Sequence, residues 1–200
     1  MSAREEILAR VRSALAGADR SAVQVPTGYR SRRREGDLVA LFAERVEHYR
    51  ATVTRCVEGD IEVALAGALP DGVRVVVPEG FGRPLPPTVT AVADDGLSAL
   101  DLDRVDAVVT AATVGIAETG TIVLTHGAGE GRRALSLVPD LHVCLVRADQ
   151  VVADVPDAIA RLDPARPQTW ISGPSATSDI ELNRVEGVHG PRTLHVVVVG

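Results

Sequence analysis

Short apolar runs rich in β-branched residues recur from residue 73 to the end of the chain. They are Val73–Val77, Thr88–Val92, Ala107–Ala111, Thr121–Thr125, Leu141–Val146, Thr169–Ser172 and Leu194–Val199. Helical patterns separate several of them, notably at residues 97–104 and 155–162. Strands that alternate with helices predict an α/β fold with a mainly parallel sheet covered by helices. Because aromatic residues make up only 2% of the chain, we expect Val, Leu, Ile and Ala to fill its core.

The first 36 residues have a different character. Ser2 and Glu5 form a capping-box pattern ahead of apolar residues at helical spacing, and Gly17 follows as a stop. Residues 18–36 are polar and include an arginine cluster, which is typical of a linker. We therefore divide the chain into an N-terminal helix and linker arm at residues 1–36 and an α/β domain at residues 37–200. Further helices are predicted at the start of this domain, over residues 37–49 and 60–69.

Charge and cysteine usage exclude several classes of function. A net charge of -6 argues against nucleic acid as the main partner. All 21 basic residues are arginine, which excludes Schiff-base and Walker-type lysine chemistry. Cys56, at a predicted polar helix end, and Cys144, in an apolar run, are too few for an iron–sulfur cluster, and no zinc-ligand spacing is present. We expect no metal and no cofactor in this chain.

The amino-terminal residues also bear on location. Residues 1–12 alternate charged and apolar residues and lack a continuous apolar stretch. A signal peptide or a membrane span requires such a stretch. We therefore expect a cytoplasmic protein without a membrane span.

Residues 112–121, with the sequence ATVGIAETGT, join two predicted strands and contain the first group of candidate site residues. Glu118 could act as a base or nucleophile, with Thr119, Gly120 and Thr121 around a bound carboxylate or phosphate. The alternative is a hairpin turn in which Glu118 is merely solvated, and spacing alone favours it. Residues 126–133, HGAGEGRR, follow the next strand, and Arg132 and Arg133 could clamp an anion there. The alternative is a plain surface loop before a short helix at residues 133–138. Because the glycine pattern is weak evidence for an anion site, the plain loop is favoured.

Residues 171–181, ISGPSATSDIE, contain the second group. Ser178 and Glu181 form a capping-box pattern, so a helix is predicted to begin near Asp179. A capped helix alone does not explain the small polar residues before it, which would surround its positive end. The candidate ligand-binding residues of this segment are Gly173, Ser175, Thr177 and Asp179.

Two histidines lie near the end of the chain. His189 could be a general acid or base, or only a turn residue, and the turn is favoured. His195 lies inside a predicted strand and is interpreted as a strand-face residue.

Ligands of parallel sheets bind beyond the carboxyl ends of the strands. We therefore expect the loops at residues 115–121, 126–133 and 173–179 to share one pocket for a small anion.

Several motifs taken together resemble the LUD domain family, and within it the C-type lactate-utilisation proteins. They are AETGT at 117–121, SLVP at 136–139, GPSATSDIE at 173–181 and GVHGP at 187–191. The resemblance extends from about residue 37 to the end and includes the N-terminal helix. It implies a fold akin to the deaminase, ribose-phosphate isomerase and CoA-transferase group.

The resemblance also implies a function. Family members take part in a three-protein system that oxidises L-lactate to pyruvate, with the iron–sulfur clusters in the partner proteins. We expect an accessory or ligand-binding subunit that has iron–sulfur partners and binds a small anion such as lactate through Arg132 or Arg133. One alternative is a stand-alone CoA-transferase-like or sugar-phosphate isomerase-like enzyme using Glu118. The other is a protein-interaction module without a ligand.

Overall fold

The computed structural model describes residues 2–19, 21, 36–177, 185–186 and 190–200. The chain divides into two compact units, residues 1–30 and residues 31–200. In the first, helix α1 (Ala3–Ala14) begins at Ser2, whose hydroxyl accepts from the Glu5 amide while the Glu5 carboxylate accepts from the Ser2 amide. The predicted N-terminal helix and its capping box are confirmed. No helix among the described residues is long and apolar enough to cross a membrane.

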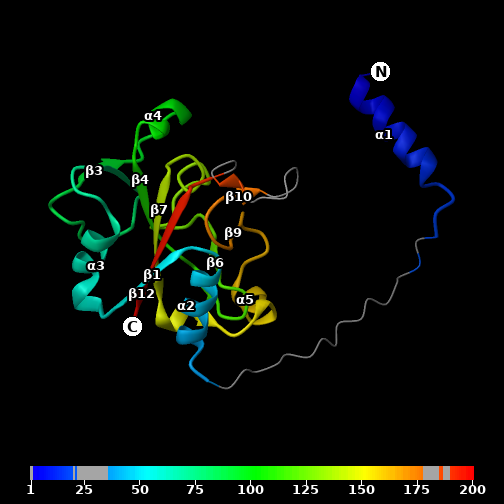
Figure 1. The fold of residues 1–200 in the computed structure, drawn as a ribbon. Helices are drawn as coiled ribbons and strands as arrows, with labels where there is room; N and C mark the ends of the chain where they lie inside the picture. The colour runs from blue at the N-terminus through cyan, green and yellow to red at the C-terminus, as the bar shows by residue number, and fades with distance from the viewer. Residues whose placement is uncertain (1, 20, 22–35, 178–184, 187–189) are drawn as a thin grey trace. The chain divides into compact units, whose positions relative to one another are not determined.

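The second unit is built on a six-stranded sheet in which every strand pairs in parallel, in the order β1-β12-β7-β4-β2-β3 (Figure 1). The predicted α/β class with a parallel sheet is therefore confirmed. The strands of this main sheet are β1 (Thr52–Cys56), β2 (Arg74–Val77), β3 (Thr90–Ala93), β4 (Ala107–Ala111), β7 (Leu141–Arg147) and β12 (Thr193–Val199).

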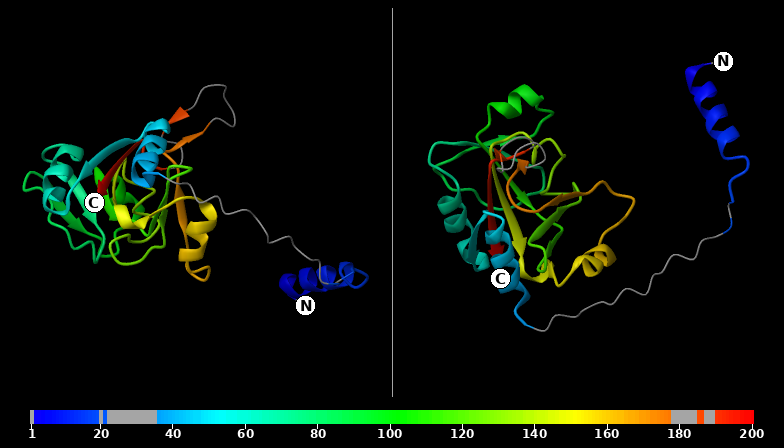
Figure 2. Two further views of the ribbon diagram at one scale, coloured as in Figure 1. Left: turned by 90° about the horizontal axis from the view of Figure 1, so that it is seen from below. Right: turned by 45° about the vertical axis from the view of Figure 1, so that its right-hand side comes forward.

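Helices cover both faces of the main sheet (Figure 2). On one face, α2 contributes Phe42 and Val46 to a core that includes Cys144 and Val146 of β7. On the other, α3 packs against the alternate residues of the same strands, such as Val143. Burial on both sides explains why the central strands are continuous apolar runs. The helices of this unit are α2 (Leu38–His48), α3 (Ile61–Ala68), α4 (Ala99–Asp103) and α5 (Val155–Arg161), with single 3-10 turns at Glu58–Asp60 and Ala148–Gln150.

A second, four-stranded sheet packs beside α2 in the order β8-β5-β6-β9. Strands β5 and β6 form an antiparallel hairpin, and β6 also pairs antiparallel with β9. Its far face is covered by α5. The strands are β5 (Val114–Ile116), β6 (Thr121–Leu124), β8 (Val151–Val152) and β9 (Thr169–Ile171), and a separate short ladder pairs β10 (Ala176–Thr177) with β11 (Val185–Glu186).

Some local predictions were wrong. Cys56 ends an edge strand rather than a helix, because residues 52–56 add to the sheet beside β12. The predicted strands at 121–125 and 169–172 belong to the small sheet and not to the main one. Residues 133–138 form turns instead of a short helix, anchored by the fully buried Leu135. The helix predicted to begin near Asp179 lies outside the described residues.

The two cysteines are expected to differ sharply in reactivity. Cys144 is fully buried in β7, and burial raises the pKa of its thiol to about 12. Cys56 is partly exposed, and burial, Asp60 and Glu58 raise its pKa. Because thiolate and access both govern alkylation, peptide mass spectrometry after maleimide treatment should find Cys56 modified in the native protein and Cys144 only after unfolding. Native labelling of both at one rate would contradict the buried position of Cys144.

Candidate functional site

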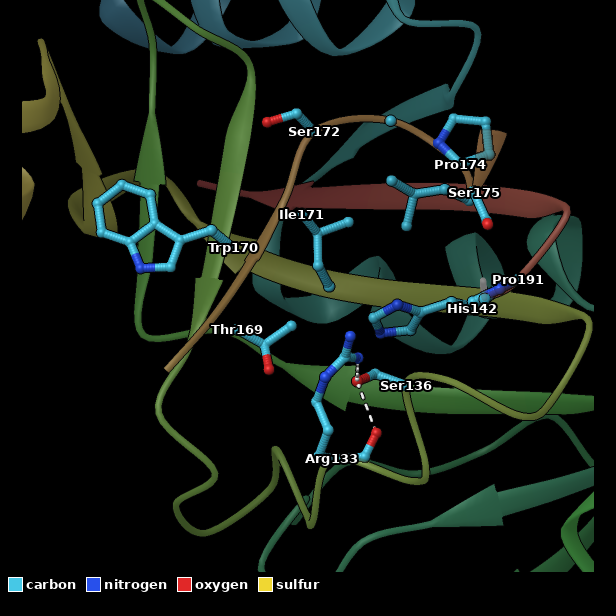
Figure 3. A pocket seen from close by; sticks show the side chains of 13 residues that line it. Arg133, Ser136, His142, Thr169, Trp170, Ile171, Ser172, Pro174, Ser175 and Pro191 are labelled. Carbon is cyan, nitrogen blue, oxygen red and sulfur yellow. Dashed lines mark hydrogen bonds between the residues drawn. The ribbon is translucent and has the colours of Figure 1, made fainter. Parts of the chain in front are cut away.

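A cavity of about 280 Å³ runs along strand β9 (Figure 3). Its walls come from the turn before β7, from β9 with the loop after it, and from the chain that enters β12. His142 and Leu194, each the second residue of its strand, place the cavity at the amino ends of β7 and β12. The expected position beyond the carboxyl ends is therefore wrong for this cavity. The residues that line it include Arg133, Ser136, His142, Thr169, Ile171 and Ser175.

Among the described residues that line the cavity, Arg133 is the cation. Figure 3 shows its guanidinium extending inward from the turn, and Nη1 donates a weak 3.4 Å hydrogen bond to the hydroxyl of Ser136. The buried Ser136 hydroxyl in turn donates to the Arg133 carbonyl at 3.3 Å, which steadies the turn. No carboxylate within the described ranges pairs with Arg133. Its charge is therefore available to a ligand.

His142 is buried beside Arg133, with 1% of its surface exposed. Its Nε2 lies 2.8 Å from the Thr110 hydroxyl on the neighbouring strand β4. Burial lowers the pKa of the imidazole to about 4. His142 is therefore neutral near pH 7, and the described lining of the cavity combines the positive charge of Arg133 with an uncharged imidazole and several hydroxyls.

Strand β9 connects the cavity to the two loops that sequence analysis singled out. At one end, the Thr169 hydroxyl lies 2.9 Å from His126 Nε2, and His126 Nδ1 donates to the Gly131 carbonyl at 2.9 Å. At the other end, the Ser172 hydroxyl lies 2.8 Å from that of Thr121. The antiparallel ladder between β6 and β9 sets this spacing, because the loops are at opposite ends of β6.

The predicted site residues do not all share this cavity. Of the predicted ligand-binding residues, Arg133, Gly173 and Ser175 line it. Thr121 does not line the cavity, but its hydroxyl contacts that of Ser172, which does. The Thr119 hydroxyl lies 2.7 Å from the Thr121 hydroxyl. The expectation of one pocket shared by all three loops is therefore wrong.

Glu118 and Gly120 belong to the predicted hairpin turn, which is confirmed between β5 and β6. Glu118 is exposed, its amide donates to the Ala153 carbonyl at 3.0 Å, and it does not line the cavity. Gly120 packs against α2. Thr177 is part of β10. Asp179 and His189 lie outside the described residues.

Arg132 has a different environment from its neighbour. Its Nε and Nη2 each donate to the Asp94 carboxylate at 2.8 Å, and these bonds lower the pKa of that carboxyl. Arg132 faces an open groove of about 610 Å³ beside the loops that follow β2 and β3. An internal carboxylate thus already occupies the guanidinium face that a ligand would need.

Several polar residues of this region were not among the predicted site residues. His142, Ser136, Thr169 and Ser172 line the cavity, although only Ser136 and Ser172 belong to motifs noted in the sequence. Another is Glu130, whose buried carboxylate accepts from the Thr113 hydroxyl at 2.5 Å and from the Thr125 amide at 2.6 Å. The Glu130 carboxylate therefore holds the glycine-rich loop in place. In the part of the chain that the structure describes, no group of three His, Cys, Asp or Glu side chains could hold a metal ion.

Comparisons with known proteins identify the family. A model of the LUD domain matches residues 85–199, which include every residue lining the cavity. The chain belongs to the LUD domain family. Lactate utilization protein C of Deinococcus radiodurans is 44% identical, over 99% of this chain and 96% of that protein. An uncharacterized protein of Neisseria meningitidis is 29% identical, over 100% and 94%.

A solved structure has the same LUD fold. The crystal structure of a DUF162 family protein from Deinococcus radiodurans superposes with a TM-score of 0.69 at 40% identity. The match covers 82% of this chain and 96% of that one. The family resemblance drawn from the motifs is therefore confirmed.

Proposed function

We propose that this LUD domain protein binds the carboxylate of a small metabolite through Arg133 and acts as a ligand-binding component in the oxidation of L-lactate to pyruvate. The observation that carries the proposal is the Arg133 guanidinium, which faces the cavity without a carboxylate partner among the described residues. The 44% identity to a lactate utilization protein C supports lactate as the substrate of the system.

The size and lining of the cavity support a short monocarboxylate. Its volume of about 280 Å³ lies at the lower limit of pockets for small molecules. One guanidinium matches one carboxylate, hydroxyls surround it, and Ile171 and Leu194 offer an apolar wall to a methyl group. A CoA thioester is far larger than this space. Glu118, the residue on which the CoA-transferase-like or isomerase-like alternative depends, does not line the cavity.

The proposal assigns the electrons of lactate oxidation to other polypeptides. This chain has only two cysteines, fewer than the four that an iron–sulfur cluster usually requires, and Cys144 is buried as a thiol within the sheet. Iron–sulfur proteins are therefore the proposed partners, and no cofactor is assigned to this chain. Copurification of a tagged, full-length chain with iron–sulfur proteins from lactate-grown cells would support this division of labour.

The direct test measures binding by isothermal titration calorimetry, because the indole of Trp170, the single tryptophan of the chain, points away from Arg133 and His142 (Figure 3). L-lactate and pyruvate should bind to the native protein, and Arg133→Ala should weaken both. A charge-assisted hydrogen bond contributes about 1.5–3 kcal/mol, which corresponds to roughly a 10- to 100-fold rise in Kd. Arg132→Ala changes the net charge equally, but its guanidinium contacts Asp94 outside the cavity. That variant should bind like the native protein.

Two results would overturn the proposal. One is equal affinity of the Arg133→Ala and Arg132→Ala variants for the two acids, which would show that the cavity is not the binding site. The other is the absence of any binding of L-lactate or pyruvate by the native protein at millimolar concentration. In cells, gene deletion should abolish growth on L-lactate, and the Arg133→Ala variant should not restore it.

A further inference from the structure

His142 is a second polar side chain in the cavity wall, and the proposed binding of a carboxylate by Arg133 assigns no role to it. Figure 3 shows the ring pointing toward the Arg133 guanidinium, with Ser136 beside it and Ile171 opposite. Among the described residues, Thr110 is the hydrogen-bond partner of this imidazole, through Nε2. The other ring nitrogen, Nδ1, makes no hydrogen bond to a described residue, and His142 lines the cavity.

The Thr110 hydroxyl can serve this imidazole in two ways. It lies 2.8 Å from His142 Nε2 and 3.5 Å from Cys144 Sγ, and it has a single proton to give. If Thr110 donates to Nε2, the proton of the neutral ring is on Nδ1, which then donates into the cavity. If Thr110 instead donates to Cys144, Nε2 carries the proton and Nδ1 accepts. Both arrangements keep the buried ring uncharged.

These contacts suggest what the imidazole recognises. Because the His142 ring lies near the Arg133 guanidinium in the cavity wall, a carboxylate bound to Arg133 would bring the adjacent carbon of the ligand close to the imidazole. We propose that His142 Nδ1 binds the oxygen on that carbon, so that the cavity takes 2-hydroxy and 2-oxo monocarboxylates in preference to the unsubstituted acid. The inference rests on the proposed function. Nδ1 accepts from a hydroxyl or donates to a carbonyl, and Thr110 is the positioning residue that sets the tautomer.

The test compares L-lactate and pyruvate with propionate, which lacks the oxygen. The native protein should bind propionate about three- to tenfold more weakly, the effect of one hydrogen bond. His142→Gln retains an amide that can reach Thr110 but leaves the Nδ1 position empty. In this variant the affinity for propionate should equal that of the native protein. The affinities for lactate and pyruvate should decrease to the same value. Retained propionate binding also shows that the variant is folded.

His195→Gln is the matched control. His195 also lies on a central strand and pairs through Nε2 with a threonine hydroxyl, that of Thr54, at 2.8 Å, but it does not line the cavity. Its variant should keep the preference for lactate over propionate. If the native protein binds all three acids equally and still depends on Arg133, this inference is wrong and the proposed function stands. If no acid binds, both are wrong.

A spectroscopic readout tests the role of Thr110 in the native protein. The imidazole ¹⁵N signals of His142, assigned by their loss in His142→Gln, report which nitrogen carries the proton. Pyruvate should increase protonation of Nδ1 and lactate that of Nε2, whereas propionate should cause neither change. In Thr110→Val both ligands should give the same tautomer. If the tautomer of His142 in the native protein is the same with every ligand, the proposed role of Thr110 in setting the tautomer is wrong.

Discussion

Gly120→Ala is expected to destabilise the protein by about 3 kcal/mol, because the new methyl group would meet backbone atoms of α2. Gly120 has a φ of 60°, and a Cβ there would lie 2.6 Å from the Arg45 carbonyl carbon and 2.8 Å from the Val46 amide nitrogen. Backbone atoms cannot rotate away as a flexible side chain can. The left-handed conformation costs about 1 kcal/mol or more and the overlap about 1–3 kcal/mol. The free energy of unfolding in urea measures the loss.

Gly72→Ala is the matched control for this prediction. Gly72 has a φ of 78°, but no atom lies within 4 Å of a Cβ built on it. It should therefore lose only the conformational contribution of about 1 kcal/mol. Equal losses in the two variants would contradict the packing explanation. The same reasoning applies to Gly173, where a Cβ would lie 2.8 Å from the Tyr49 carbonyl oxygen. Packing against α2 and against Tyr49, the residue that follows it, thus explains Gly120 and Gly173 without a ligand.

The main sheet could be predicted from the sequence because its central strands are buried on both faces. Such strands are continuous runs of β-branched residues, and β4, β7 and β12 have this pattern. The edge strand β1, with the sequence TVTRC, was missed because it pairs only with β12 and mixes polar with apolar residues. Strand β5 contains Gly115, which carries no strand signal but lies against the Phe42 ring and Val146.

The candidate site was predictable only in part. Arg132 and Arg133 are adjacent and chemically identical, and sequence alone offered no choice between them. The structure distinguishes them, because Asp94, 38 residues before Arg132 in the sequence, pairs with Arg132, whereas Arg133 lines the cavity. His142 could not be predicted as a site residue, because one histidine in an apolar run shows no sign of a cavity. Its position opposite Arg133 depends on how the turn at residues 131–136 packs, which is tertiary information.

Burial of His142 should make the protein less stable as the pH falls. The folded pKa is about 4 and the unfolded value is 6.5. Below pH 6.5 the unfolded chain takes up a proton that the folded protein does not, so protonation favours unfolding. The stability due to the neutral imidazole is thus complete above pH 6.5 and is lost between pH 6.5 and about 4. At 1.36 kcal/mol per pKa unit, the loss over this window is about 3 kcal/mol.

Urea unfolding of the native protein and of His142→Gln at pH 7 and pH 5 isolates this contribution. The native protein should lose about 2 kcal/mol more than the variant between these two values, because glutamine does not titrate there. The pKa of the Asp94 carboxyl is lowered by Arg132 and that of His195 by burial, and both contributions are common to the two proteins. The same pH dependence in both proteins would mean that His142 reaches solvent and is not held neutral by burial. The imidazole beside Arg133 would then be charged at mildly acidic pH, and a neutral hydrogen bond from Nδ1 to the ligand could form only at higher pH.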